Sequence, residues 1–179
     1  PLLQPLKNKG LEELAMDLWA LKIYLPGAIA ESRQSHVRLI KGQQWEEFTP
    51  ESCAALLTEP YRISPDSERM GYRLQGAPLL MTTPRQMISE GTTFGTIQVP
   101  AGGQPIILMA DRQTTGGYPK MAYVASIDLP RLAQMGPGDM VSFKAISLEQ
   151  AQTLEVARAQ AFATLAQTLQ PVRTLLLNH

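Results

Sequence analysis

The sequence predicts a mainly β protein built as a closed β-barrel, with a few short helices and one long helix toward its C-terminal end. Three observations predict this class. Short apolar runs recur between residues 69 and 146, glycine and proline turns separate them, and few segments show helical periodicity. A barrel is favoured over a sandwich because closure removes the exposed edges that so many short strands would leave.

The first predicted elements combine helices with short strands. Leucines at spacings of three and four predict a helix over residues 8–21, and alternation predicts a strand over 37–40. Thr49, followed by a proline and an acid, is a typical helix start, and this helix ends before Pro60. Residues 61–64 then alternate as a strand should.

The middle of the chain is predicted to be strand and turn. Residues 71–74 alternate, and the runs 95–99 and 105–110 flank a Pro-Ala-Gly-Gly turn, which indicates a hairpin. A further strand is predicted over 121–127.

The last predicted elements are two helices and one strand. Asp128 is predicted to cap a short helix, and residues 140–146 form the final strand. Ser147 and Gln150 have the spacing of a capping box. The long helix that they begin is predicted to end at Pro171.

Composition excludes several classes of protein. The chain has 179 residues, 44% of them hydrophobic and 18% charged, and a formal net charge of zero, so neither nucleic acid nor a membrane is an expected partner. The single cysteine, Cys53, favours a reducing, cytoplasmic location and is expected to be a buried structural thiol. Two distant histidines and no zinc-type spacing predict no metal site, and the sequence lacks the GxxxxGK[ST] phosphate loop.

Polar residues gather in a glycine-rich loop that follows an apolar strand. Asp111, Gln113, Thr114 and Thr115 precede paired glycines, which permit close backbone approach to a ligand. Such a loop is either a binding site at the barrel rim or a tight turn whose hydroxyls satisfy the local backbone.

Two further segments carry charged candidates. Arg69 and Arg73 flank strand residues near an acid, and arginine grips a carboxylate with two parallel hydrogen bonds. Glu90 stands in a polar turn ahead of Gly95. The alternatives are a weak surface ion pair for the arginines and an ordinary turn for Glu90.

Three motifs resemble one known family. They are "SERMGYRL" (67–74), "SEGTTFGTIQVPAGGQPIILMADRQTTGGYP" (89–119) and "DLPRLAQMGPGDMVSF" (128–143). In this order they are similar to the biotin-dependent carboxyltransferase-like family, which includes the C component of bacterial 5-oxoprolinase, the KipA proteins and the carboxyltransferase domain of urea amidolyase. One departure is Glu68, where the family usually has aspartate.

The resemblance implies a cyclophilin-like β-barrel over residues 36–147. It also implies that the chain is the second half of a two-half protein, with residues 1–35 as the tail of the first half or a connection, and 148–179 as a C-terminal helix. We therefore expect this piece to be inactive alone, because a pocket shared between two halves loses one wall.

Three functions follow from the resemblance. The first is a 5-oxoprolinase component that opens 5-oxoproline to glutamate with a KipI-like B component and an A component, ATP being bound by a partner. The second is transfer of a carboxyl group from carboxybiotin to urea. The third is a KipA-type protein that binds a kinase inhibitor without catalysis. The first is favoured because the sequence shows no fused carrier or carboxylase domain, and the absence of a Met-Lys-Met biotinylation sequence argues against the second.

For that function the sequence predicts one shared pocket. Asp111 and Glu90 are the predicted catalytic residues. Arg69, Arg73, Gln113, Thr114 and Thr115 are predicted to bind the small-molecule substrate.

Overall fold

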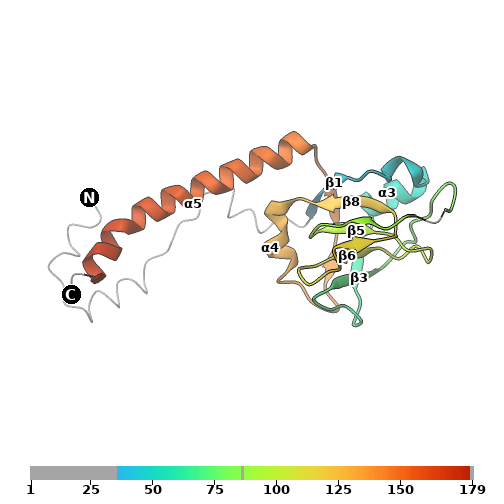
Figure 1. Cartoon of the computed structure of the whole chain (residues 1–179), viewed down its shortest axis with the longest axis horizontal. Helices are drawn as coiled ribbons and strands as arrows, with labels where there is room; N and C mark the ends of the chain where they lie inside the picture. The colour runs from blue at the N-terminus through green and yellow to red at the C-terminus, as the bar shows by residue number, and fades with distance from the viewer. Residues whose placement is uncertain (1–35, 86, 178–179) are drawn as a thin grey trace. The chain divides into compact units, whose positions relative to one another are not determined.

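The computed structural model describes residues 36–85 and 87–177. Eight strands form one sheet in the order β10-β1-β8-β5-β6-β3-β2-β9 (Figure 1). The two edge strands, β9 (Met140–Val141) and β10 (Phe143–Ala145), are separated in the chain by Ser142 alone, so the sheet is a nearly closed barrel. This confirms the predicted fold class. The remaining strands of the sheet are β1 (Val37–Lys41), β2 (Tyr61–Ile63), β3 (Gly71–Gln75), β5 (Thr96–Gln98), β6 (Ile106–Leu108) and β8 (Lys120–Val124).

A second, two-stranded ribbon lies outside this order. It consists of β4 (Glu90–Gly91) and β7 (Thr115–Gly116), paired antiparallel. The short helices are η3 (Trp45–Glu47), α3 (Pro50–Thr58), η4 (Ser126–Asp128) and α4 (Leu129–Leu132). The long helix α5 spans Leu148–Leu177. All strands and short helices belong to one compact unit that ends at Glu155, and the rest of α5 belongs to a second unit.

Most of the predictions made from local sequence signals are confirmed. The Thr49 hydroxyl accepts a hydrogen bond from the Ser52 backbone N–H and caps α3. At the start of α5, Ser147 and Gln150 exchange the two hydrogen bonds of a capping box, at 2.9 and 3.2 Å. The hairpin between β5 and β6 also forms as predicted.

Three element boundaries were predicted wrongly. The strand expected to reach Ile127 ends at Val124, because η4 begins at Ser126. The last strand is divided at Ser142, where the chain leaves one edge of the sheet for the other. Helix α5 continues through Pro171, although proline removes one backbone hydrogen bond and disfavours a helix interior. The helix predicted over residues 8–21 lies outside the described residues.

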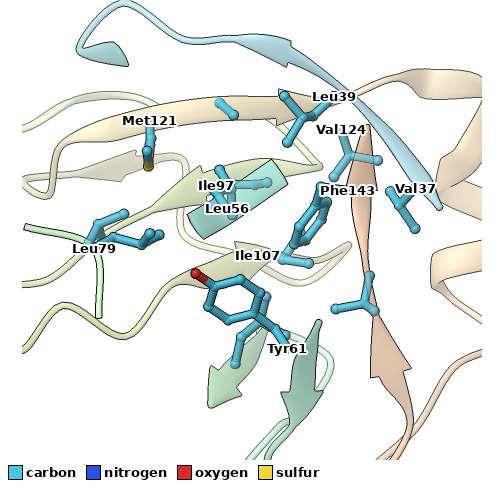
Figure 2. Close-up of a cluster of buried hydrophobic side chains, with 14 of the residues drawn as sticks. Val37, Leu39, Leu56, Tyr61, Leu79, Ile97, Ile107, Met121, Val124 and Phe143 are labelled. Carbon is cyan, nitrogen blue, oxygen red and sulfur yellow. The ribbon is translucent and has the colours of Figure 1, made fainter. Parts of the chain in front are cut away.

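The core fills the barrel interior with one contiguous apolar cluster (Figure 2). Alternate residues contribute in most strands, as the period of two requires, whereas β8 contributes Met121 and Ala122 in succession. The rings of Tyr61 and Phe143 lie 6.3 Å apart within it. The Tyr61 hydroxyl is satisfied by donating to the carbonyl of Ala77 at 3.1 Å.

Burial raises the pKa of Tyr61 from its ordinary value of 10.0 to about 12. Between pH 10 and 12 the unfolded chain loses the phenolic proton, whereas the folded chain keeps it. The contribution of protonated Tyr61 to the free energy of unfolding is therefore complete below pH 10 and is lost as the pH rises toward 12. We expect Tyr61→Phe to cost about 1 kcal/mol at pH 7, through the lost hydrogen bond. Urea unfolding should show the difference from wild type shrinking between pH 10 and 12. A difference that stays constant over this range would contradict the assignment.

Candidate functional site

Four residues form a row across four adjacent strands. Arg73 of β3 pairs in register with Ile106 of β6, and Ile106 pairs with Gln98 of β5. Gln98 pairs in turn with Lys120 of β8. The residues next to them along the strands, Leu74, Ile97, Ile107 and Met121, are buried in the core. Because side chains alternate between faces, this outer row (Arg73, Ile106, Gln98 and Lys120) lies on the outside of the barrel.

A cavity of about 580 Å³ lies over the outer row, and we call it the polar cavity. Arg73, Ile106 and Gln98 line one side of it. The ribbon strand β7, through Thr115 and Gly116, lines another. The cavity is therefore an open hollow between the barrel surface and β7 of the ribbon, and this volume is ample for a small-molecule ligand.

The polar cavity contains one cation and one anion that are not neutralised by contacts within the described chain. The Arg73 backbone N–H donates to Ser67, but its guanidinium has no hydrogen bond or ion pair among the described residues. The Glu68 side chain, which also lines the cavity, is likewise unpaired within that part of the chain. An exposed guanidinium in this state can bind a carboxylate through two parallel hydrogen bonds.

Gln98 supplies a buried amide beneath the ribbon. Its side chain donates from Nε2 to the carbonyl of Tyr118 at 3.5 Å, and the residue is 4% exposed. Gly116 packs directly on this amide, because a Cβ at that position would lie 2.7 Å from Gln98 Nε2. A side chain at 116 would therefore require the Gln98 amide to shift, whereas glycine lets the ribbon approach the barrel with this amide in place.

The structure places three of the predicted site residues in the polar cavity: Arg73, Gln113 and Thr115. Thr114 follows Gln113 but does not line the cavity; its carbonyl accepts from the Thr92 N–H at 2.9 Å. The predicted rim position was wrong, since the cavity lies against the outer face of the sheet. Sequence alone could not show this, because it depends on where the β4–β7 ribbon folds back.

Arg69 and Asp111 are close to each other but do not line the polar cavity. The Arg69 Nε lies 3.0 Å from Asp111 Oδ2, with side chains 85% and 47% exposed. The Asp111 N–H also donates to the carbonyl of Arg69. The prediction that both side chains share one cavity with Arg73 is therefore corrected: they form the exposed ion pair that was the alternative interpretation.

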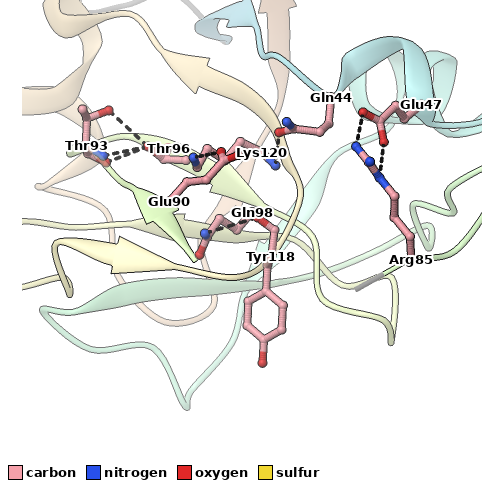
Figure 3. A network of polar contacts seen from close by, with 9 residues as sticks. All are labelled: Gln44, Glu47, Arg85, Glu90, Thr93, Thr96, Gln98, Tyr118 and Lys120. Carbon is pink, nitrogen blue, oxygen red and sulfur yellow. Dashed lines mark hydrogen bonds and ion pairs between the residues drawn. The ribbon is translucent and has the colours of Figure 1, made fainter. Parts of the chain in front are cut away.

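Glu90 likewise pairs within the chain. Its Oε2 lies 2.6 Å from Nζ of Lys120, whose side chain is only 5% exposed (Figure 3). The sequence does not predict Lys120 as a site residue, because it precedes the strand predicted over 121–127 and its partner lies 30 positions away. The sequence predicts no site role for Glu68, which is only a departure from the family motif. Its exposed position leaves room for the extra methylene.

A second cavity, of about 450 Å³, shares Gly117 and Tyr118 with the polar cavity. Apolar residues dominate its walls, and its one charged member, Arg85, makes two hydrogen bonds to Glu47, at 2.7 and 3.0 Å. Figure 3 shows this pair apart from the two members of the outer row that it draws, Gln98 and Lys120. Among the residues described, the walls of this second cavity offer no unpaired charge to a ligand.

Other candidate chemistry is sparse in the described residues. Burial and, to a lesser extent, the nearby Glu46 carboxylate raise the pKa of the Cys53 thiol, which opposes thiolate formation. Cys53 is partly rather than fully buried, and Sγ lies 3.5 Å from the Trp45 carbonyl. Within residues 36–85 and 87–177, no group of three or more metal-ligating side chains occurs. The same part of the chain has no helix with the length and apolarity to cross a membrane.

Comparison with protein families identifies the chain's relatives. The model of the carboxyltransferase domain, subdomain A and B, matches residues 10–145, beginning well ahead of the first resembling motif. The C component of Escherichia coli 5-oxoprolinase is 42% identical over 132 residues, which are 74% of this chain and 43% of that protein. Its Haemophilus influenzae counterpart is 43% identical over 118 residues, 66% of this chain and 38% of the relative. The chain thus spans less than half the length of these relatives.

A solved structure supports the fold. The crystal structure of the K. lactis urea amidolyase matches with a TM-score of 0.68 over 76% of this chain and 9% of that one. At 20% sequence identity this likeness concerns the fold alone.

Proposed function

Because the chain belongs to the family of carboxyltransferase domains with subdomains A and B, we propose that it is part of the C component of a 5-oxoprolinase. The observation that carries the proposal is identity above 40% to two bacterial proteins of that name. In the complete enzyme the lactam ring of 5-oxoproline is opened to glutamate with ATP hydrolysis. The proposed partners are a KipI-like B component and an A component, in the cytoplasm, with ATP bound by a partner.

The chemistry of the polar cavity suits this substrate. 5-Oxoproline combines a carboxylate with a cyclic amide, and the cavity combines a guanidinium, on Arg73, that is unpaired within the described chain with the side-chain amides of Gln98 and Gln113. Arg73 would hold the carboxylate through two parallel hydrogen bonds. An amide side chain offers both a donor and an acceptor, as the lactam does, so it can pair with the ring amide and orient it.

The positions of Asp111 and Glu90 alter the proposed division of roles. Both carboxylates are engaged by cations of this chain and neither lines the polar cavity. Glu68 is the carboxylate that does line it, among the residues described. We therefore propose Glu68 in place of Asp111 and Glu90 as the acid–base candidate of this chain, at a site completed by its partners.

The test is ATP-dependent formation of glutamate from 5-oxoproline by the full-length protein assembled with its partner proteins. We expect turnover that requires ATP and every component. Carboxylation of urea by a carboxybiotin carrier, without lactam opening, would contradict the proposal in favour of the urea amidolyase type. Stable binding of a KipI-like partner with no turnover would contradict it in favour of a non-catalytic antagonist.

A further inference from the structure

We infer that Lys120 and Glu90 are positioning residues of the polar cavity, whose ion pair fastens the β4–β7 ribbon to the barrel. The expected change in KM rests on the proposed function, whereas the attachment of the ribbon by this ion pair does not. It starts from the deeply buried ammonium group of Lys120, a titratable group that the proposed chemistry does not use.

Lys120 is placed to connect the two walls of the cavity. It is the neighbour of Gln98 in the outer row, and its backbone N–H donates to the Gln44 side chain at 3.0 Å. Within the described chain, the hydrogen bond and ion pair of Nζ both go to Glu90, at 2.6 Å. A lysine with 5% of its side chain exposed needs such a counter-charge, since burial of an unpaired ammonium is costly.

The ribbon depends on this connection because it is small. Each strand has two residues, in the register Glu90 with Gly116 and Gly91 with Thr115. An isolated ribbon of this size is marginal in water. Besides Glu90–Lys120, the Gln98 amide contacts the Tyr118 carbonyl, at 3.5 Å, a weak hydrogen bond. The Val99 N–H also donates to the carbonyl of Pro119 at 3.0 Å, just beyond the ribbon. Of the side-chain contacts between ribbon and barrel, the charged one is therefore the stronger.

The consequence for the cavity follows from the register. Glu90 lies opposite Gly116, and Gln113, Thr115 and Gly116 all line the polar cavity. The ion pair between Glu90 and Lys120 therefore keeps β7 in place over Gln98. Because β7 forms one wall of the polar cavity, that wall is kept in place as well. Glu90 thus acts through the ribbon and does not need to touch the substrate.

The experiment compares Lys120→Met, Glu90→Gln and the double variant in the assembled full-length complex. Methionine fills the buried site, and Glu90, 44% exposed, can be hydrated when left alone. We expect Lys120→Met to raise KM for 5-oxoproline about tenfold with kcat changed less than about twofold, and the double variant to match Lys120→Met, because Glu90 has no partner left to lose. Glu90→Gln leaves the buried ammonium without its counter-charge and should raise KM at least as much. Amide hydrogen exchange over residues 113–117 should quicken about tenfold.

Glu47→Gln is the matched control, because it weakens another Arg/Lys–Glu pair that lies outside the polar cavity. It should leave both readouts unchanged. Unaltered KM and exchange in Lys120→Met would overturn the inference, as would a fall in melting temperature with no local change in exchange. If the wild-type complex does not open 5-oxoproline, yet exchange quickens in the ribbon alone, the proposed function fails and the positioning role stands.

Discussion

Asp128→Ala is expected to lower the free energy of unfolding by about 3–5 kcal/mol, because it removes the carboxylate from a buried ion pair. The two side chains, Arg38 and Asp128, are 8% and 6% exposed. Arg38 donates to Asp128 from Nε at 2.9 Å, from Nη2 at 2.6 Å and from its backbone N–H at 2.7 Å. The pair ties β1 to η4, so the substitution takes three hydrogen bonds and an ion pair from a buried arginine.

The control is Glu47→Ala, which breaks an Arg–Glu pair of similar two-bond geometry at the surface. The side chains of Arg85 and Glu47 are 55% and 35% exposed, and we expect a cost below about 1 kcal/mol. Urea unfolding of the full-length protein measures both. Equal costs for the two variants would show that burial does not decide the contribution of these pairs.

Arg73→Ala is expected to raise KM for 5-oxoproline about 10- to 100-fold in the assembled enzyme, which corresponds to the loss of charged hydrogen bonds. The guanidinium lines the polar cavity without a partner among the described residues, so a substrate carboxylate would be its counter-ion. Melting temperature should change little, because an exposed residue with no side-chain contacts of this kind contributes little to folding.

Two arginine variants make this result specific. Arg62→Ala removes an exposed arginine of β2 that does not line the polar cavity, and it should leave KM unchanged. Arg69→Ala removes the partner of Asp111 and should change KM less than about threefold. A larger effect from Arg69 than from Arg73 would restore the site predicted from the sequence and contradict the one built from the structure.

The sequence predicted elements whose signals are local. The Thr49 cap, the Ser147 capping box and the β5–β6 hairpin each depend on residues within a few positions of one another, and each formed as expected. Pro171 is the exception, since a helix can continue past a single missing hydrogen bond.

The sequence could not predict contacts between distant residues. Asp128 has the position of a helix cap, yet its side chain makes no capping bond and pairs with Arg38, 90 positions away. Similarly, its residue type was enough to predict Arg73 as a substrate-binding residue, but the sequence predicted no role for Lys120. The outer row that joins them depends on strand order and register, which a single sequence does not contain.

The most direct test of the central claim, that Arg73 binds the substrate carboxylate, removes each partner of the contact in turn. Calorimetry would measure binding of 5-oxoproline and of 2-pyrrolidinone, the same lactam without its carboxylate, to wild-type and Arg73→Ala complexes. We predict that Arg73→Ala weakens binding of 5-oxoproline about tenfold or more and leaves binding of 2-pyrrolidinone unchanged. Equal weakening of both ligands, or of neither, would contradict the claim.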